Sequence, residues 1–224
     1  NATNQVDILA MVFKAPGGHL AVYGTGIVGD FNLEVAILTV INRSTGLNPN
    51  IVVREKDDLI ITRNYVTNGG LYAAGGLIDV ELAGRDAVLT HRSGVISTAS
   101  SGGDIRLVAD DMDLRAGYAS ISSSGELFIL AQSSDQMYRI GGAGQSIYAV
   151  DCTLSGPDGS LDLSLRDMDS FAAGFETIHI GADGGNNRML LGDLRVKTYP
   201  FFATLVVDAD GAEILTPGGE LTFT

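Results

Sequence analysis

The fold is decided by the stretch Gly102-Gly103-Asp104-Ile105-Arg106-Leu107-Val108-Ala109 together with Gly125-Glu126-Leu127-Phe128-Ile129-Leu130. Each stretch leaves a glycine turn and then alternates, so that Ile105 and Leu107 share one face, as do Leu127 and Ile129. This alternation predicts a strand with one buried face. Because so short a strand cannot bury that face alone, and because Leu127 follows Ile105 by 22 residues, we expect successive units to stack.

The same alternation recurs in short segments along the chain. In one of them Ile78, Val80 and Leu82 share a face, while Asp79 and Glu81 lie on the other. Units of roughly 20 to 27 residues, each made of short strands and sharp turns, are typical of a solenoid or a sandwich. A Gly-Gly or Ser-Gly doublet precedes strands at Gly70, Gly76, Gly103, Gly125 and Gly219. Small residues stacked at corners favour the solenoid, so we predict an all-β, right-handed parallel β-helix, with a β-sandwich as the alternative.

The organisation of the chain follows from where this repeat holds. Residues 1–49 contain strand-forming segments at irregular spacing, which predicts N-terminal coils or a cap. Residues 50–224 are predicted to form the β-helix repeats, with a possible extruded loop at 130–153, where the repeat is lost. Residues 167–175 have apolar side chains at helical spacing over two turns, which predicts one helical turn or a decorated loop.

The composition excludes several classes of partner. The chain has 224 residues, 29 of them glycine, and a formal net charge of −13. Nucleic acid is not expected as a partner, because phosphate contacts need clustered Lys and Arg. No stretch approaches the ~20 apolar residues of a membrane-spanning helix, so no membrane-spanning segment is expected. Cys152 is the single cysteine, which excludes an intrachain disulfide and predicts a small core residue.

Two blocks of sequence resemble a known family. Residues 102–114 followed by 121–127, and residues 159–169 followed by 173–181, are similar to the repeat of filamentous-haemagglutinin-like bacterial adhesins and related giant surface proteins. The resemblance covers about residues 50 to 224 and depends on pattern more than on any single residue. It implies a parallel β-helix passenger exported to the bacterial cell surface or the extracellular matrix, with a structural or adhesive role.

A glycan-active enzyme, either a polysaccharide lyase or a hydrolase, is the alternative function. Such chemistry needs paired carboxylates, because one group donates a proton while another acts as base or nucleophile. The candidate carboxylates are Asp110, Asp111 and Asp113, with Asp167 and Asp169, and the arginines available to lie beside them are Arg106, Arg115 and Arg166. Alternation places Asp111 and Asp113 on one side and Met112 on the other. Solvated turn carboxylates are the favoured interpretation, so we do not expect an enzyme.

Calcium is the cofactor that the sequence gives some reason to consider. Asp110, Asp111 and Asp113 offer the hard oxygen ligands that calcium prefers, and so does Asp183 in the glycine-rich stretch 181–187. One weak match of this kind is more typical of an ordinary surface loop, so no cofactor is expected. The three histidines, His19, His91 and His179, lack the spacing of a zinc site, and His179 is predicted to point outward.

Binding by a β-helix would use its faces, its loops or its ends. Tyr138 and Tyr148 lie in the predicted loop, which makes them candidates to bind a cell-surface or matrix glycan or protein. Strand groups left unpaired at an end could join another copy of the chain, giving filaments assembled end to end.

Overall fold

Strands make up nearly all of the regular structure in the part of the chain that the computed structural model describes. The described residues are 11–24, 30–43, 50–63, 69–99, 102–134, 136–140, 160–181, 189–191, 204–207 and 214–215. The strands are β1 (Met11–Gly24), β2 (Asp30–Asn42), β3 (Ile51–Glu55), β4 (Leu59–Ile61), β5 (Leu71–Ala73), β6 (Ile78–Leu82), β7 (Val88–His91), β8 (Ile96–Ser97), β9 (Ile105–Val108), β10 (Asp111–Asp113), β11 (Ile121–Ser122), β12 (Leu127–Leu130), β13 (Met137–Ile140), β14 (Ser160–Leu163), β15 (Thr177–Ile180), β16 (Met189–Leu191), β17 (Thr204–Val207) and β18 (Ile214–Leu215). One helical turn, α1 (Leu165–Met168), overlaps the segment predicted at 167–175 only at residues 167–168; residues 169–175 form turns and a bridge.

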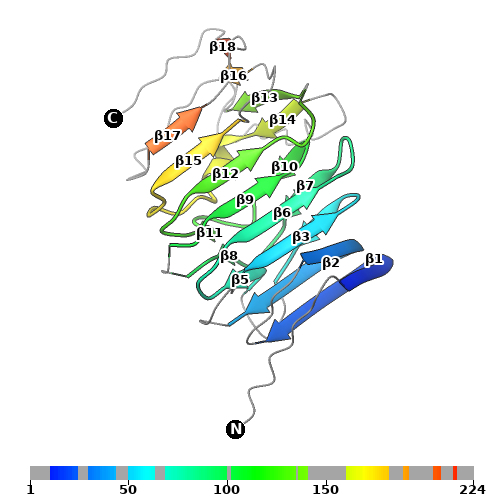
Figure 1. The fold of residues 1–224 in the computed structure, drawn as a ribbon. Coiled ribbons are helices and arrows are strands. Elements are labelled where there is room, and N and C mark those ends of the chain that lie inside the picture. Colours follow the sequence, from blue (N-terminus) through cyan, green and yellow to red (C-terminus); the bar gives the residue numbers. More distant parts are fainter. Residues whose placement is uncertain are drawn as a thin grey trace.

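The described strands form a curled parallel sheet. Fourteen of them belong to one sheet, and every pairing recorded among the described strands is parallel. Figure 1 shows the strands stacked one above another, from β1 near the N-terminus to β17 near the C-terminus. The all-β prediction is therefore confirmed, and the antiparallel pairing of the β-sandwich alternative is not what these strands adopt.

The curl of the sheet comes from β2, because different parts of this strand pair with three different later strands. Residues 30–33 pair with β3, residues 37–38 with β4, and residues 40–42 with β5. Three rows of strands therefore leave β2. The long row runs β3–β6–β9–β12–β15–β17, the second row β4–β7–β10, and the third row β5–β8–β11. The third row is extended by a bridge from Ile121 to Phe171.

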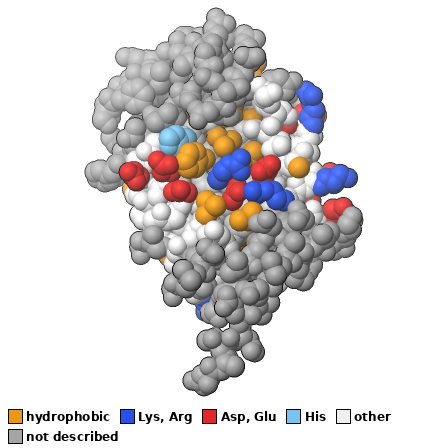
Figure 2. Space-filling model, viewed as in Figure 1, with side chains coloured by type: hydrophobic (Ala, Val, Ile, Leu, Met, Phe, Trp, Pro, Cys, Tyr) orange, Lys and Arg blue, Asp and Glu red, His pale blue; other side chains and the backbone are white. Residues whose placement is uncertain are grey.

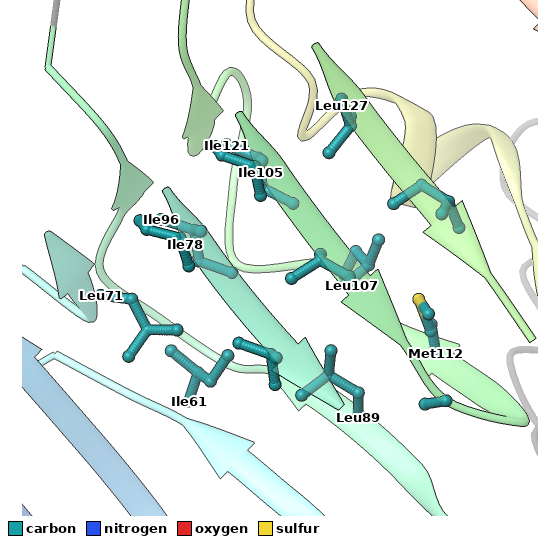
Figure 3. Packing of buried hydrophobic residues seen from close by; sticks show 14 of the residues in the cluster. Ile61, Leu71, Ile78, Leu89, Ile96, Ile105, Leu107, Met112, Ile121 and Leu127 are labelled. Carbon is teal, nitrogen blue, oxygen red and sulfur yellow. The ribbon is translucent and has the colours of Figure 1, made fainter. Parts of the chain in front are cut away.

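Aliphatic side chains fill the space inside the curl, as Figure 3 shows. In the long row Ile51 pairs with Ile78, Ile78 with Ile105, and Ile105 with Leu127, and all four side chains are buried. The second row contributes Leu59, Leu89 and Met112 in register, and the third row contributes Leu71, Ile96 and Ile121. Each fully buried aliphatic side chain contributes about 2 kcal/mol to folding. The predicted inward faces, including that of Ile78, Val80 and Leu82, are confirmed.

Glycines stack where the chain turns into the long row. A Cβ added to Gly103 would lie 2.2 Å from the backbone oxygen of Gly76, and one added to Gly125 would lie 2.7 Å from the backbone oxygen of Gly102. Neighbouring strands lie ~4.8 Å apart, so at these corners two backbones come close enough to exclude any side chain. This agrees with the predicted stacking of small residues at the corners.

A second sheet of four described strands has the order β14–β13–β16–β18, and β14 packs beside β10. Although β13 comes before β14 in the sequence, it is β14 that lies next to the second row (Figure 1). Met137–Ile140 is thus a paired strand, which corrects the predicted loop at 130–153 over this part; residues 141–153 lie outside the described residues. Tyr138 points into the core from this strand.

Candidate functional site

The outward side of the long row is the face seen in Figure 2, where acidic, basic and hydrophobic side chains lie interleaved. Strand alternation places the side chains between the inward aliphatic positions on this outer side. In register across the row are Val52, Asp79, Arg106, Phe128 and His179. The row therefore carries opposite charges on adjacent strands and then two rings.

The charged part of this face is a network of four side chains. Asp79 accepts hydrogen bonds from Arg54 at 2.7 Å on one side and from Arg106 at 2.8 Å on the other. Glu81 lies 3.5 Å from the Arg54 guanidinium and 3.4 Å from that of Arg106. The Asp79 side chain is only 11% exposed, so its two arginine partners compensate a largely desolvated charge.

Removing one arginine should weaken this network measurably. We expect Arg106→Ala to lower the free energy of unfolding by up to about 1 kcal/mol, because the remaining arginine cannot satisfy both carboxylates and the pairs are partly exposed. Urea unfolding at low and at high salt measures the effect, and the loss should shrink as salt screens the pairs. Arg115→Ala, which breaks a pair with Asp113, is the control and should cost less. Equal losses that do not depend on salt would contradict the role of the network.

The aromatic part of the face is a stacked pair of rings. The Phe128 and His179 ring centroids are 4.6 Å apart, and the ring planes differ by 6°. His179 Nε2 lies 3.6 Å from a Glu126 carboxylate oxygen. Because β12 and β15 are adjacent parallel strands, the two rings come into contact as neighbours in register. The predicted outward direction of His179 is confirmed.

Sequence reasoning identified Asp79 and Glu81 as outward but missed the network that they form. The missing signal was the spacing: Arg54 and Arg106 stand 25 and 27 residues from Asp79, close to one repeat unit on either side. Opposite charges at the repeat distance on the outward positions would have identified this network.

Three predicted carboxylates lie in a different place, at the boundary between β10 and the second sheet. Asp110, Asp111 and Asp167 are buried, with exposed fractions of 0%, 3% and 5%. Their interpretation as solvated turn carboxylates is therefore wrong for these three residues. The physical reason is that β14 and α1, which come about fifty residues later, cover the end of the second row.

Asp110 holds the connection between β12 and β13 against the second row. Its carboxylate accepts hydrogen bonds from the Ser133 backbone N–H at 2.7 Å, the Ser133 hydroxyl at 2.6 Å, and the Asp86 backbone N–H at 3.0 Å. Its backbone oxygen accepts a further bond from Gln136 at 2.8 Å. The Asp110 carboxylate is thus engaged in joining segments of the chain.

Asp167 has a similar role on the other side of β10. Its carboxylate accepts hydrogen bonds from the Leu114 backbone N–H at 2.7 Å and from the Ser164 backbone N–H at 2.8 Å, as well as from the Ser164 hydroxyl. Burial raises the pKa of Asp167 above its usual value, while these hydrogen bonds oppose the shift. The residue connects the end of β10 with the end of β14.

Asp111 is the carboxylate with the most perturbed environment. Burial raises the pKa of Asp111 to about 7, and the negative charges of Asp162 and Asp167 act in the same direction. One oxygen accepts the Met112 backbone N–H at 2.8 Å, whereas Oδ2 is buried without a hydrogen-bond partner. A carboxyl group protonated near neutral pH is the form that this environment favours.

The other candidate carboxylates and arginines make their contacts away from the buried group of Asp110, Asp111 and Asp167. Asp113 lies beside it, but its carboxylate pairs with Arg115, which lowers the pKa of Asp113. Arg106 belongs to the outer network of the long row, and Arg166 is exposed on α1. Asp169 is half-buried, and its backbone oxygen accepts the Ala119 N–H. The structure therefore brings Asp111 and Asp167 together without Arg106, Arg115 or Arg166 in their hydrogen bonds.

Metal binding was considered for the same acids. Within the described ranges, no group of three or more His, Cys, Asp or Glu side chains is arranged to hold a metal ion. Asp183 lies outside the described residues, as do Tyr148 and Cys152. The predicted binding residue Tyr138 is fully buried, and its hydroxyl accepts the Ala131 backbone N–H at 2.6 Å. Tyr138 was predicted as a binding residue on a loop, but it lies on strand β13 with its ring in the core.

The three histidines are in three different environments. His19 lies 3.1 Å from the Thr39 hydroxyl, and His179 is on the outer face. His91 pairs in register with Ile61 and is 1% exposed, which places its imidazole among the inward side chains of the second row. Burial lowers the pKa of His91 to about 4, so the neutral ring is the form that packs there.

Acidification should therefore destabilise the fold through His91. The pKa in the folded state lies below the usual 6.5, so the contribution is fully present above pH 6.5 and is lost as the pH falls toward 4. We expect His91→Leu to remove this component. Between pH 7.5 and pH 5 the wild type should lose about 2 kcal/mol more of its free energy of unfolding than the variant does. Urea unfolding across this pH range measures it, with His19→Leu as the control. A variant whose pH profile runs parallel to that of the wild type would contradict the assignment.

No protein-family model, curated protein or solved structure matches the chain significantly. Within the described residues, no helix has the length and apolar character needed to span a membrane.

Proposed function

We propose that the chain is a right-handed parallel β-helix that acts as a structural or adhesive segment of an exported bacterial surface or matrix protein. The single observation that carries the proposal is the register of the three rows, which stacks buried aliphatic side chains strand upon strand from β2 onward. Parallel strands joined by crossover connections are right-handed in almost all proteins, which gives the proposed hand. An extended stack of this kind suits a scaffold that presents its outer faces.

The outer face of the long row is the proposed contact surface for a cell-surface or matrix glycan or protein. It offers two arginines held in fixed positions by Asp79, together with the stacked rings of Phe128 and His179. Rigid aromatic groups beside hydrogen-bonding side chains are common in binding surfaces. We propose this face as the binding surface in place of Tyr138, because the Tyr138 side chain is buried.

Self-association end to end is a further part of the proposal. Strand β1 pairs with β2 along its length, and no strand among the described residues pairs with the opposite edge of β1. Pro16 has no backbone N–H, and Gly17 has a φ of 78°, where the register between β1 and β2 shifts. Regular pairing with another copy would therefore use the two halves of β1 on either side of this irregularity.

A glycan-active enzyme is the second candidate function, favoured by one observation. The raised pKa of Asp111, close to Asp162 and Asp167, is a pattern found in catalytic acids. Against it, the Asp111 carboxylate is 3% exposed, and the neighbouring acids form hydrogen bonds with the chain itself. A structural role explains more of the hydrogen bonds made by these buried acids than a catalytic role does.

Binding and turnover can be tested on one preparation. The purified chain is assayed on arrays of host and bacterial glycans and on cells, with Phe128→Ala and Arg106→Ala as test variants and Tyr118→Ala, an exposed ring outside the long row, as the control. We expect binding that falls at least about tenfold in the test variants and not in the control. Absence of binding in every assay would contradict the adhesive role. Depolymerisation of a polysaccharide, lost in Asp111→Asn, would establish the enzyme instead.

Filament formation needs a separate measurement. Sedimentation and electron microscopy over a range of protein concentrations should show linear assemblies that lengthen with concentration. Substituting Ala21 and Tyr23 of β1, both exposed, with lysine should shorten them, because charged side chains on an edge strand oppose pairing. Monomers at every concentration would contradict end-to-end association without affecting the test of surface binding.

A further inference from the structure

The boundary between β10 and β14, which we call the seam, differs from the contacts between successive described strands within each row. Within each of the three rows, adjacent described strands share a backbone ladder. At the seam, β10 and β14 pack side by side, but no ladder is recorded between them. The second row therefore ends at β10, and the four-stranded sheet begins at β14 without backbone continuity.

Side-chain carboxylates take the place of the missing ladder. Asp167 accepts backbone N–H groups from both sides of the seam, Leu114 after β10 and Ser164 after β14. Asp110, immediately before β10, accepts the backbone N–H and the hydroxyl of Ser133, on the segment that leads into β13. Two carboxylates thus hold the four-stranded sheet against the second row.

The seam also contains three buried carboxyl groups. Asp110, Asp111 and Asp167 are all at least 95% buried, and Asp111 Oδ2 has no hydrogen-bond partner. The nearby Asp162 carboxylate is held by Arg139 on β13, within the four-stranded sheet itself. Buried carboxylates side by side repel each other, and a polar atom buried without a partner lowers the stability of the contact. Asp111 is in register with the half-buried Val88 of β7, and Met112 takes the inward position that Leu89 has on β7.

We propose that the sheet β14–β13–β16–β18 opens as one unit along the seam while the three rows stay folded, with Asp110 and Asp167 as the latches. Opening moves the buried side chains of Tyr138, Leu161 and Leu163 away from the shared core and breaks a few side-chain hydrogen bonds, but it separates no recorded backbone ladder. Opening between β6 and β9 exposes buried aliphatic side chains and also breaks a ladder, so it costs more. Local opening follows the boundaries that cost least to separate. The four-stranded sheet is then less stable than the three rows against which it packs.

Hydrogen exchange on the whole chain tests the proposal. In the wild type, the amides of Leu114, Ser133 and Ser164, which donate to the two latches, should exchange through one common opening. This opening should be more frequent than the one that exchanges the amides of β6 and β9. Protection of these three amides equal to that of β6 and β9 in the wild type would overturn the proposal, whatever the variants do.

The latches are tested by substitution. Asp167→Asn and Asp110→Asn each replace an accepting oxygen with a donor. Asp167→Asn should raise exchange of the Ser133 amide, which Asp110 holds, and Asp110→Asn that of the Leu114 and Ser164 amides, about 10- to 100-fold with no change in β6 and β9. Asp113→Asn, which breaks the neighbouring pair with Arg115 but does not reach across the seam, should leave exchange in both regions unchanged. If Asp167→Asn and Asp110→Asn instead raise exchange equally in all strands, the stack opens as a whole and the seam has no separate role.

Discussion

Gly103→Ala is expected to lower the free energy of unfolding by about 3 kcal/mol, because among the described glycines whose surroundings are known its added Cβ would lie closest to another atom. The added Cβ would lie 2.2 Å from the backbone oxygen of Gly76 and 2.7 Å from its carbonyl carbon. Both atoms belong to backbone, so relief requires β6 and β9 to separate. Those two strands form the middle of the long row, and their separation would weaken the stacking of Ile78 on Ile105.

Chemical denaturation with urea measures this loss, and Gly117→Ala is the matched control. Gly117 has a φ of 146°, and an added Cβ there meets nothing within 4 Å. The control therefore reports only the backbone strain of placing alanine at positive φ, about 1 to 2 kcal/mol. If Gly103→Ala costs no more than Gly117→Ala, close stacking of the two glycine corners does not matter for stability.

Asp111→Asn is expected to stabilise the protein at alkaline pH. The pKa of Asp111 is about 7 in the folded chain, above the usual 3.8, so its favourable contribution is fully present below pH 3.8 and is lost as the pH rises through 7. At pH 8 the buried carboxylate is ionised and costs about 3 to 4 kcal/mol relative to the neutral acid. Asparagine has a similar shape, carries no charge, and can still accept the Met112 N–H.

The measurement is the free energy of unfolding of wild type and Asp111→Asn at pH 5 and pH 8. The variant should gain about 3 kcal/mol over the wild type between these two pH values. Asp113→Asn is the control, because pairing with Arg115 lowers the pKa of Asp113 and its substitution should give no gain at pH 8. Parallel profiles for wild type and Asp111→Asn would show that Asp111 is ionised at little cost.

The alternation of apolar and polar side chains was sufficient to predict the strands and their inward faces. Ile105 and Leu127 were expected to stack from their separation alone, and they are paired in register. The glycine corners followed from the same repeat, because the positions of Gly76 and Gly103 recur before successive strands. Such features depend on residues within one or two repeat units, which is the distance over which a sequence pattern is informative.

The environment of the buried acids could not be predicted in this way. Asp110 and Asp111 follow β9 in a stretch that reads as a polar turn, and the segments that bury them come from β14 and α1. The order β14–β13 departs from the order of the sequence, so no periodic pattern places β14 beside β10. Tyr138 was assigned to a loop for the same reason, because its strand pairs with neighbours that lie outside the regular repeat.

The inner and outer sides of the long row carry different information about the order of the strands. Ile51, Ile78 and Ile105 are identical side chains in register, so burial at this position does not distinguish one order of the three strands from another. On the outside, the same strands carry Arg54, Asp79 and Arg106. Bringing β3 directly against β9 would leave Arg54 and Arg106, two positions apart in register, as diagonal neighbours without the carboxylates of β6 between them. Hydrophobic burial thus decides which face of each strand points inward, while the alternation of charge distinguishes the correct neighbour from an incorrect one.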